Sequence, residues 1–173
     1  MDFLIYDQKS IPKDRWRYGL RSVGATGCGP IAAYNALCLL GYHPKMEPIV
    51  RWFERNVPLI NGNLGTFVLT PAQFFKKLGF PVRVITRRSG FDEAARSSDV
   101  CLLFYRWQKK LKGGAHYVAL QYKNGRFTGY NTYRNAQAPD DYGESLEAFL
   151  KKRKYFFTVL IAVKAKAKET AYE

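Results

Sequence analysis

One stretch in the second half of the chain constrains the fold more than any other. Residues 115–133 read AHYVALQYKNGRFTGYNTY, in which two alternating apolar and polar stretches flank Asn124 and Gly125. Asn-Gly is the strongest short-range signal for a two-residue β-hairpin turn. We therefore predict an antiparallel hairpin in which Lys123 pairs with Arg126 and the pairing continues along both strands.

This register brings a histidine and an asparagine together. Asn131 faces Val118 and lies on the same side of the hairpin as His116, because side chains alternate along a strand. The two are then diagonal neighbours, roughly 7 Å apart at the backbone. Asn131 can accept the ring N–H and fix which ring nitrogen acts as a base, with Tyr133 and Asn135 as weaker candidates. The alternative interpretation is a structural histidine in a strand, whose ring nitrogens only make ordinary hydrogen bonds.

The remaining pattern places helices before strands. We expect helices over 29–40, from about Pro48, and from Thr70 as N-cap with Pro71 in the first position. Strands then follow, with one late helix, over residues 81–86, 99–107, 115–133 (the hairpin), 142–154 (the helix) and 155–165. This order predicts an α+β domain with helices packed on an antiparallel sheet.

No repeat or linker divides the 173 residues, so we expect a single domain over 1–173 with a frayed tail over 165–173. No apolar run approaches the ~20 residues that a membrane span needs. The N-terminal MDFLIYDQKS lacks the apolar core of a secretory signal, which predicts a cytoplasmic protein.

A cysteine stands where a helix is expected to begin. In ATGCGPIAAYNAL, Cys28 lies between two glycines directly before the predicted helix. Unpaired N–H groups and the positive end of the helix dipole favour a thiolate, which predicts a lowered thiol pKa and a place for an oxyanion. The alternative is an ordinary loop cysteine beside a glycine turn.

The other cysteines and histidines suggest no further chemistry. Cys38 and Cys101 lie in apolar stretches and are expected to be inert, buried thiols. An odd number of cysteines argues against a disulfide framework. His43 follows the far end of the predicted helix, and no closely spaced metal motif exists, so we predict neither a metal nor a cofactor.

The chain is strongly basic. It has 28 Lys and Arg against 14 Asp and Glu, a formal net charge of +14. Such a surface attracts anions, including acidic substrates, although the lysines can equally serve only to keep the protein soluble. Because no nucleic-acid-binding motif accompanies the charge, we do not expect nucleic acid as a partner. The sequence makes no prediction of oligomeric state.

Three motifs in order resemble a known superfamily. GCGPIAAYNAL, then GAHYVAL, then Asn131 fifteen residues past His116, resemble the Cys–His–Asn/Asp order of papain-like cysteine peptidases. The pattern is most similar to the bacteriocin-leader-processing peptidases and their standalone bacterial relatives. DRWRYGLRSVGATGCGP also resembles a run in these relatives, so the likeness covers Asp14 to Tyr133.

The resemblance implies a papain-like α+β fold, with a central N-terminal helix carrying the cysteine, and hydrolysis of peptide or amide bonds through a thioester acyl-enzyme. It implies Cys28 as nucleophile, His116 as general base and acid, and Asn131 as orienter, where many relatives have aspartate. Papain-like enzymes usually carry an oxyanion glutamine six residues before the cysteine, and Ser22 stands there. Gln8 is a second oxyanion candidate if its loop folds back. The alternative function is a weakly active or inactive papain-like module that binds peptides.

Overall fold

The structure, a computed structural model, describes residues 4–56, 66–109, 112–132 and 137–167. Along the described chain the elements are η1 (Gln8–Ser10), β1 (Arg17–Tyr18), β2 (Arg21–Ser22), α1 (Val23–Thr26), α2 (Cys28–Leu39), α3 (Met46–Asn56), α4 (Thr70–Lys77), β3 (Val82–Ile85), η3 (Arg88–Gly90), α5 (Phe91–Arg96), β4 (Val100–Lys109), β5 (Lys112–Lys123), β6 (Arg126–Tyr130), β7 (Asp140–Gly143), α6 (Leu146–Lys152) and β8 (Phe156–Val163). Within these residues, no helix is both long and apolar enough to cross a membrane.

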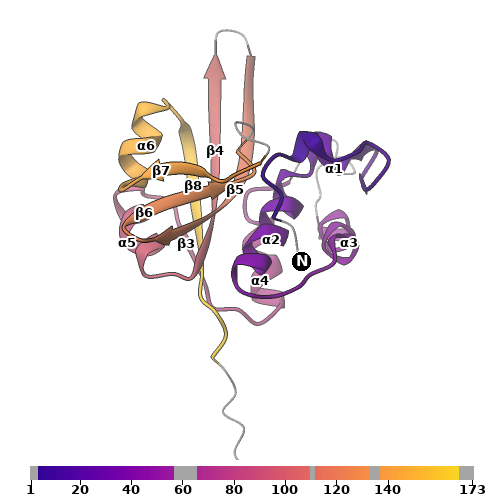
Figure 1. Cartoon of the computed structure of the whole chain (residues 1–173), viewed down its shortest axis with the longest axis horizontal. Helices are drawn as coiled ribbons and strands as arrows, with labels where there is room; N and C mark the ends of the chain where they lie inside the picture. The colour runs from indigo at the N-terminus through magenta and orange to yellow at the C-terminus, as the bar shows by residue number, and fades with distance from the viewer. Residues whose placement is uncertain (1–3, 57–65, 110–111, 133–136, 168–173) are drawn as a thin grey trace, which may run out of the picture.

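A six-stranded antiparallel sheet forms the centre of the molecule, in the order β3-β8-β4-β5-β6-β7. Helices α2, α3 and α4 cover one face, and α5 and α6 cover the other (Figure 1). Each face has its own apolar core. The predicted arrangement of helices packed on an antiparallel sheet is confirmed.

The unbroken apolar run at the start of β4 follows from this layering. Leu102 and Phe104 point into the core under α2, whereas Cys101, Leu103 and Tyr105 point into the core under α5 and α6. A strand that is buried on both faces has no polar side, so its sequence loses the period-two alternation.

Helix α2 is the central helix, and it begins at Cys28, one residue earlier than predicted. It lies between the sheet and helices α3 and α4, and most of its side chains are buried. Ala32, Ala33 and Ala36 have no exposed surface, and their small size allows the neighbouring elements to pack closely on several sides. The predicted apolar face is therefore part of a helix that is buried nearly all round.

Three further helices also differ from the prediction at their boundaries. Helix α3 begins at Met46, before Pro48. Thr70 is the first residue of α4 and Leu69 is its N-cap, so the predicted Thr70 cap is wrong. Helix α6 is shorter than the predicted 142–154, because Tyr142 and Gly143 belong to β7.

Some elements were not foreseen. Helix α5 and strand β7 fall in segments to which the sequence analysis assigned no structure or another one. Strands β4 and β5 extend beyond the predicted ranges 99–107 and 115–133, and they remain paired as far as Lys109 and Lys112. Gly114 belongs to this ladder, and a Cβ there would lie 2.4 Å from the Trp107 ring.

The hairpin has the predicted register. Strands β5 and β6 pair from Lys123 with Arg126 down to Ala119 with Tyr130. Asn124 and Gly125 both adopt left-handed conformations, with φ of 52° and 78°, as a type I′ turn requires. The predicted C-terminal tail begins just past β8, and its residues 168–173 lie outside the described chain.

Candidate active site

The candidate site forms where β6 leaves β5. Their ladder ends at Ala119 and Tyr130. The next residue, Asn131, has a left-handed backbone with φ of 67°, which turns the chain away from the sheet. The backbone N–H of Thr132 then bonds to the carbonyl oxygen of Tyr6 (3.2 Å) instead of continuing the ladder.

This departure releases a backbone N–H next to the histidine. Lys123 and Arg126 flank the two-residue turn, so hydrogen-bonded pairs recur at every second residue after them. The N–H of Tyr117 therefore points toward a place that Thr132 would occupy if β6 continued. This N–H instead lies near enough to the Cys28 thiol to lower its pKa, which places the thiol beside the residue that follows His116.

Cys28 is the first residue of α2, after the N-cap Gly27. Burial raises the pKa of its thiol, while hydrogen bonds from the N–H groups of Tyr117, Gly29 and Cys28 itself act in the opposite direction. The predicted net lowering of this pKa is wrong, although the helix N-terminus acts as expected. The side chain is only partly buried in the structure, unlike that of Cys101.

The other two thiols lie elsewhere. Cys101 is buried in β4, and burial raises its pKa to about 12. Cys38 lies near the opposite end of α2 and is half-buried; its pKa is also raised by burial. The expectation of a buried thiol is confirmed for Cys101 and only partly for Cys38.

His116 is fully buried in β5, edge-on to the ring of Tyr105. Its Nε2 lies 2.5 Å from the backbone carbonyl oxygen of Asn131. A carbonyl can only accept, so Nε2 carries the proton of the neutral ring and Nδ1 carries the lone pair. Burial lowers the pKa of His116 to about 4, against smaller raising effects of the Asn131 bond and of Asp7.

Asn131 contacts the histidine through its backbone, which the hairpin argument did not foresee. The side chain of Asn131 instead bonds to Gln8: the backbone N–H of Gln8 donates to Asn131 Oδ1 (2.8 Å), and Asn131 Nδ2 donates to Gln8 Oε1 (3.0 Å). The left-handed φ explains the difference, because it rotates the Asn131 peptide out of the strand geometry that the argument assumed. Tyr133 and Asn135, the weaker candidates, lie outside the described residues.

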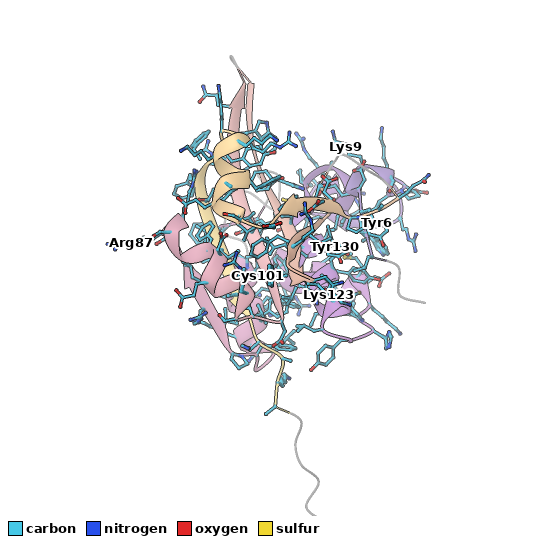
Figure 2. The ribbon with its side chains drawn as sticks, turned by 60° about the vertical axis from the view of Figure 1, so that its left-hand side comes forward. Tyr6, Lys9, Arg87, Cys101, Lys123 and Tyr130 are labelled. Atoms are coloured by element: carbon cyan, nitrogen blue, oxygen red, sulfur yellow. The ribbon has the colours of Figure 1, made fainter. Side chains whose placement is uncertain are left out.

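The N-terminal segment does fold back, as a role for Gln8 requires. Gln8 begins η1 and is almost completely buried. Its Nε2 donates to the carbonyl oxygen of Gly24 (3.2 Å), four residues before Cys28. Tyr6 stacks on Tyr130 with ring centroids 6.2 Å apart, and both are labelled where the N-terminal segment meets the end of β6 (Figure 2). Ser22, the other oxyanion candidate, ends β2 and makes no side-chain capping bond to α1.

Two tyrosines and a threonine around the cysteine were missed by the sequence analysis. Tyr18 and Tyr117 are fully buried, and the charge of a Cys28 thiolate is near enough to raise both phenol pKa values further, beyond the main effect of burial. The Tyr18 hydroxyl lies 3.2 Å from Thr66 Oγ1. A Cβ on Gly29 would lie 2.2 Å from the same oxygen, so only glycine fits here. The Tyr-Gly pair at 18–19, part of the motif run, was the available signal.

The residues that the structure describes show no arrangement of side chains typical of a metal site. No group of three or more His, Cys, Asp or Glu side chains among them is arranged to hold a metal ion. His43 is exposed beyond the C-terminal end of α2, far along the helix from Cys28.

Of the comparisons with known proteins, the one with solved structures gives a match. No family model matches the sequence, and no curated protein matches it. Among solved structures, the chain is similar to the peptidase domain of Streptococcus ComA, a bi-functional ABC transporter involved in a quorum-sensing pathway. The match has a TM-score of 0.55 at 16% sequence identity, and covers 84% of this chain and 98% of that domain. The fold is therefore α+β and papain-like, as expected.

Proposed function

We propose that this protein is a papain-like cysteine hydrolase of peptide or amide bonds, related to the bacteriocin-leader-processing peptidases. Cys28 is the nucleophile, His116 the general base and acid, and Asn131 the residue that orients the histidine. One observation carries the proposal: the backbone N–H groups at the start of α2 and of Tyr117, the neighbour of His116, lie near enough to the Cys28 thiol to lower its pKa. The fold shared with a peptidase domain supports it.

The resting pair is neutral in this proposal. Burial disfavours both the thiolate of Cys28 and the imidazolium of His116. Proton transfer from sulfur to Nδ1 therefore accompanies attack on the substrate carbonyl, when the charge moves onto the substrate oxygen. The Asn131 carbonyl holds the proton on Nε2 throughout, so that Nδ1 is the nitrogen that accepts.

The reaction then proceeds through an acyl-enzyme. Cys28 sulfur bonds to the carbonyl carbon, the C–N bond breaks, and the leaving amine takes the proton from His116. Water attacks the thioester with His116 again as base, which releases the acid and restores the thiol. The Cys28 N–H is the oxyanion donor we favour, and Gln8 and Ser22 are the two side-chain candidates.

A panel of peptides, amides and thioesters tests the proposal. We expect Cys28→Ala and His116→Ala to abolish measurable turnover, because each removes a group that makes or breaks a bond. Cys38→Ala and Cys101→Ala are the matched controls and should keep wild-type activity. Mass spectrometry should detect a thioester adduct on Cys28 with substrates that acylate faster than they hydrolyse.

Two outcomes would contradict the proposal. One is turnover that survives Cys28→Ala, and the other is an adduct on Cys38 or Cys101 in place of Cys28. Loss of activity in the control variants would indicate damaged folding, so each variant is compared with the wild type by circular dichroism.

A second candidate function is a peptide-binding module without turnover. Ser22 in place of the expected glutamine, together with the raised pKa of Cys28, favours it. A module of this kind would bind peptides equally well as wild type and as Cys28→Ala, and would form no acyl adduct with any thioester.

A further inference from the structure

We propose that Gln8 is a positioning residue that acts on His116 through Asn131, so that the N-terminal segment is a working part of the site. The inference rests on the proposed function. It gives Gln8 a role different from that of an oxyanion donor, and it explains why an asparagine stands at position 131.

Three hydrogen bonds run in one direction through the two buried amides. The backbone N–H of Gln8 donates to Asn131 Oδ1 (2.8 Å), Asn131 Nδ2 donates to Gln8 Oε1 (3.0 Å), and Gln8 Nε2 donates to the carbonyl oxygen of Gly24 (3.2 Å). The series starts at a backbone group that can only donate and ends at one that can only accept. Both amide orientations are therefore fixed by their partners.

This direction requires an amide at position 131. An aspartate would accept from the Gln8 N–H, but its second oxygen would face Gln8 Oε1 with no proton between them. Turning the Gln8 amide round would then place its oxygen against the Gly24 carbonyl. Because Gln8 and Asn131 are both buried, neither oxygen can turn to water, and the mismatch is costly.

The hydrogen bonds between Gln8 and Asn131 hold the peptide group of Asn131, whose carbonyl orients the histidine. Asn131 has a left-handed backbone, which few residues adopt without local support. Its side chain is fixed by Gln8, and the next N–H, of Thr132, is fixed by the Tyr6 carbonyl. The carbonyl between these two anchors is the one that accepts from His116 Nε2 at 2.5 Å.

The same N-terminal segment is anchored to the helix that carries Cys28. Asn35 of α2, also fully buried, accepts from the Ile5 N–H (2.9 Å) and donates to the Ile5 carbonyl (2.8 Å). Gly24 allows the segment to approach, since a Cβ there would lie 2.8 Å from the Gln8 carbonyl oxygen. Residues 5–8 thus connect the cysteine-bearing half of the site with the histidine-bearing sheet.

Ring-nitrogen NMR of ¹⁵N-histidine-labelled protein at pH 7 tests the inference. We expect wild-type His116 to be a single Nε2–H tautomer, and Gln8→Ala and Asn131→Asp to give a mixture of tautomers. Turnover of the best substrate should fall on the order of 100-fold in kcat in both variants, with KM little changed, because a misplaced base affects the chemical step. Gln73→Ala and Asn124→Asp are matched controls at exposed positions, and both should behave as wild type.

Two results would overturn the inference. The first is a wild-type ring that is not the Nε2–H tautomer. The second is a folded Gln8→Ala or Asn131→Asp protein that keeps the single tautomer, whether or not it is active. If that protein has also lost activity, Gln8 is an oxyanion donor or a substrate contact instead. The tautomer is read without substrate, so a failure of the proposed function, in which no substrate is turned over, leaves this result decisive.

Discussion

At the scale of single residues, burial keeps the titratable groups of the candidate site uncharged. Cys28 and His116 both lie in surroundings that disfavour their charged forms, and the tyrosines beside the cysteine are neutral phenols. In the proposed mechanism, the neutral thiol becomes nucleophilic only as its proton passes to His116, so its attack on any electrophile needs the histidine. Hydrolysis of an amide also needs the oxyanion donors, because negative charge then forms on the substrate oxygen.

Burial of His116 predicts a specific loss of stability in acid. Its pKa is about 4 in the folded protein against an ordinary 6.5, so the unfolded chain binds more protons between these values and stability falls as pH drops below 6.5. Between pH 7 and 4.5, wild type should lose roughly 2 kcal/mol of unfolding free energy more than His116→Gln loses. Urea denaturation at both pH values measures the difference.

His43→Gln is the control for this prediction, because His43 is exposed and its substitution should leave the acid sensitivity of the wild type unchanged. Equal losses of stability in wild type and His116→Gln would show that the pKa of His116 is not lowered in the folded protein.

The sequence selected Cys28, His116 and Asn131 as candidates, because each carries a local signal: glycines before a helix, a strand histidine, and a register set by a turn. It did not reveal that Asn131 contacts His116 through its backbone carbonyl. The left-handed turn at Asn131 and the return of Gln8 depend on contacts between residues 123 positions apart, and no local pattern encodes such contacts.

At the scale of elements, the β5–β6 hairpin determines where the site forms. Its two-residue turn fixes the register, and the register decides that the Tyr117 N–H faces the gap left by β6. The hairpin was predictable because its signal is local. Helix α5 and strand β7 were not, because α5 is short and β7 is stabilised by pairing with β6 rather than by its own composition.

Gly125→Ala should weaken the turn that sets this register. Gly125 has φ of 78°, and an alanine there costs about 1 to 2 kcal/mol of unfolding free energy because its Cβ crowds the backbone in the left-handed region. Thermal and urea denaturation measure the loss. Asn124→Gly, in the same turn, should be close to wild type, and an equal effect of both substitutions would contradict the type I′ assignment.

At the scale of the whole molecule, the charge is the feature least explained by the fold. Part of it lies at a surface pocket on α3, which is lined by Lys45, Arg51 and Arg55 together with Trp52, Pro48 and the acidic Glu47. We expect this basic surface to favour acidic peptides as substrates, and the alternative is that it serves only to keep the protein soluble. The predicted cytoplasmic location and the single domain over 1–173 stay predictions.

Salt dependence tests the attraction of acidic substrates. Raising NaCl from 50 to 500 mM shortens the range of electrostatic attraction. The value of kcat/KM for an acidic peptide should therefore fall roughly tenfold, while that of a neutral peptide of equal length stays nearly constant. If the kcat/KM values of the two peptides respond to salt in the same way, the net charge of +14 serves solubility and does not attract acidic substrates.

The most direct test of the central claim, that His116 activates Cys28, is the rate at which iodoacetamide modifies each of the three cysteines at pH 7, measured by peptide mass spectrometry in wild type and His116→Ala. We predict that Cys28 reacts fastest in the wild type and that only its rate falls in His116→Ala. Equal rates at Cys28, Cys38 and Cys101, or a Cys28 rate that does not depend on His116, would contradict it.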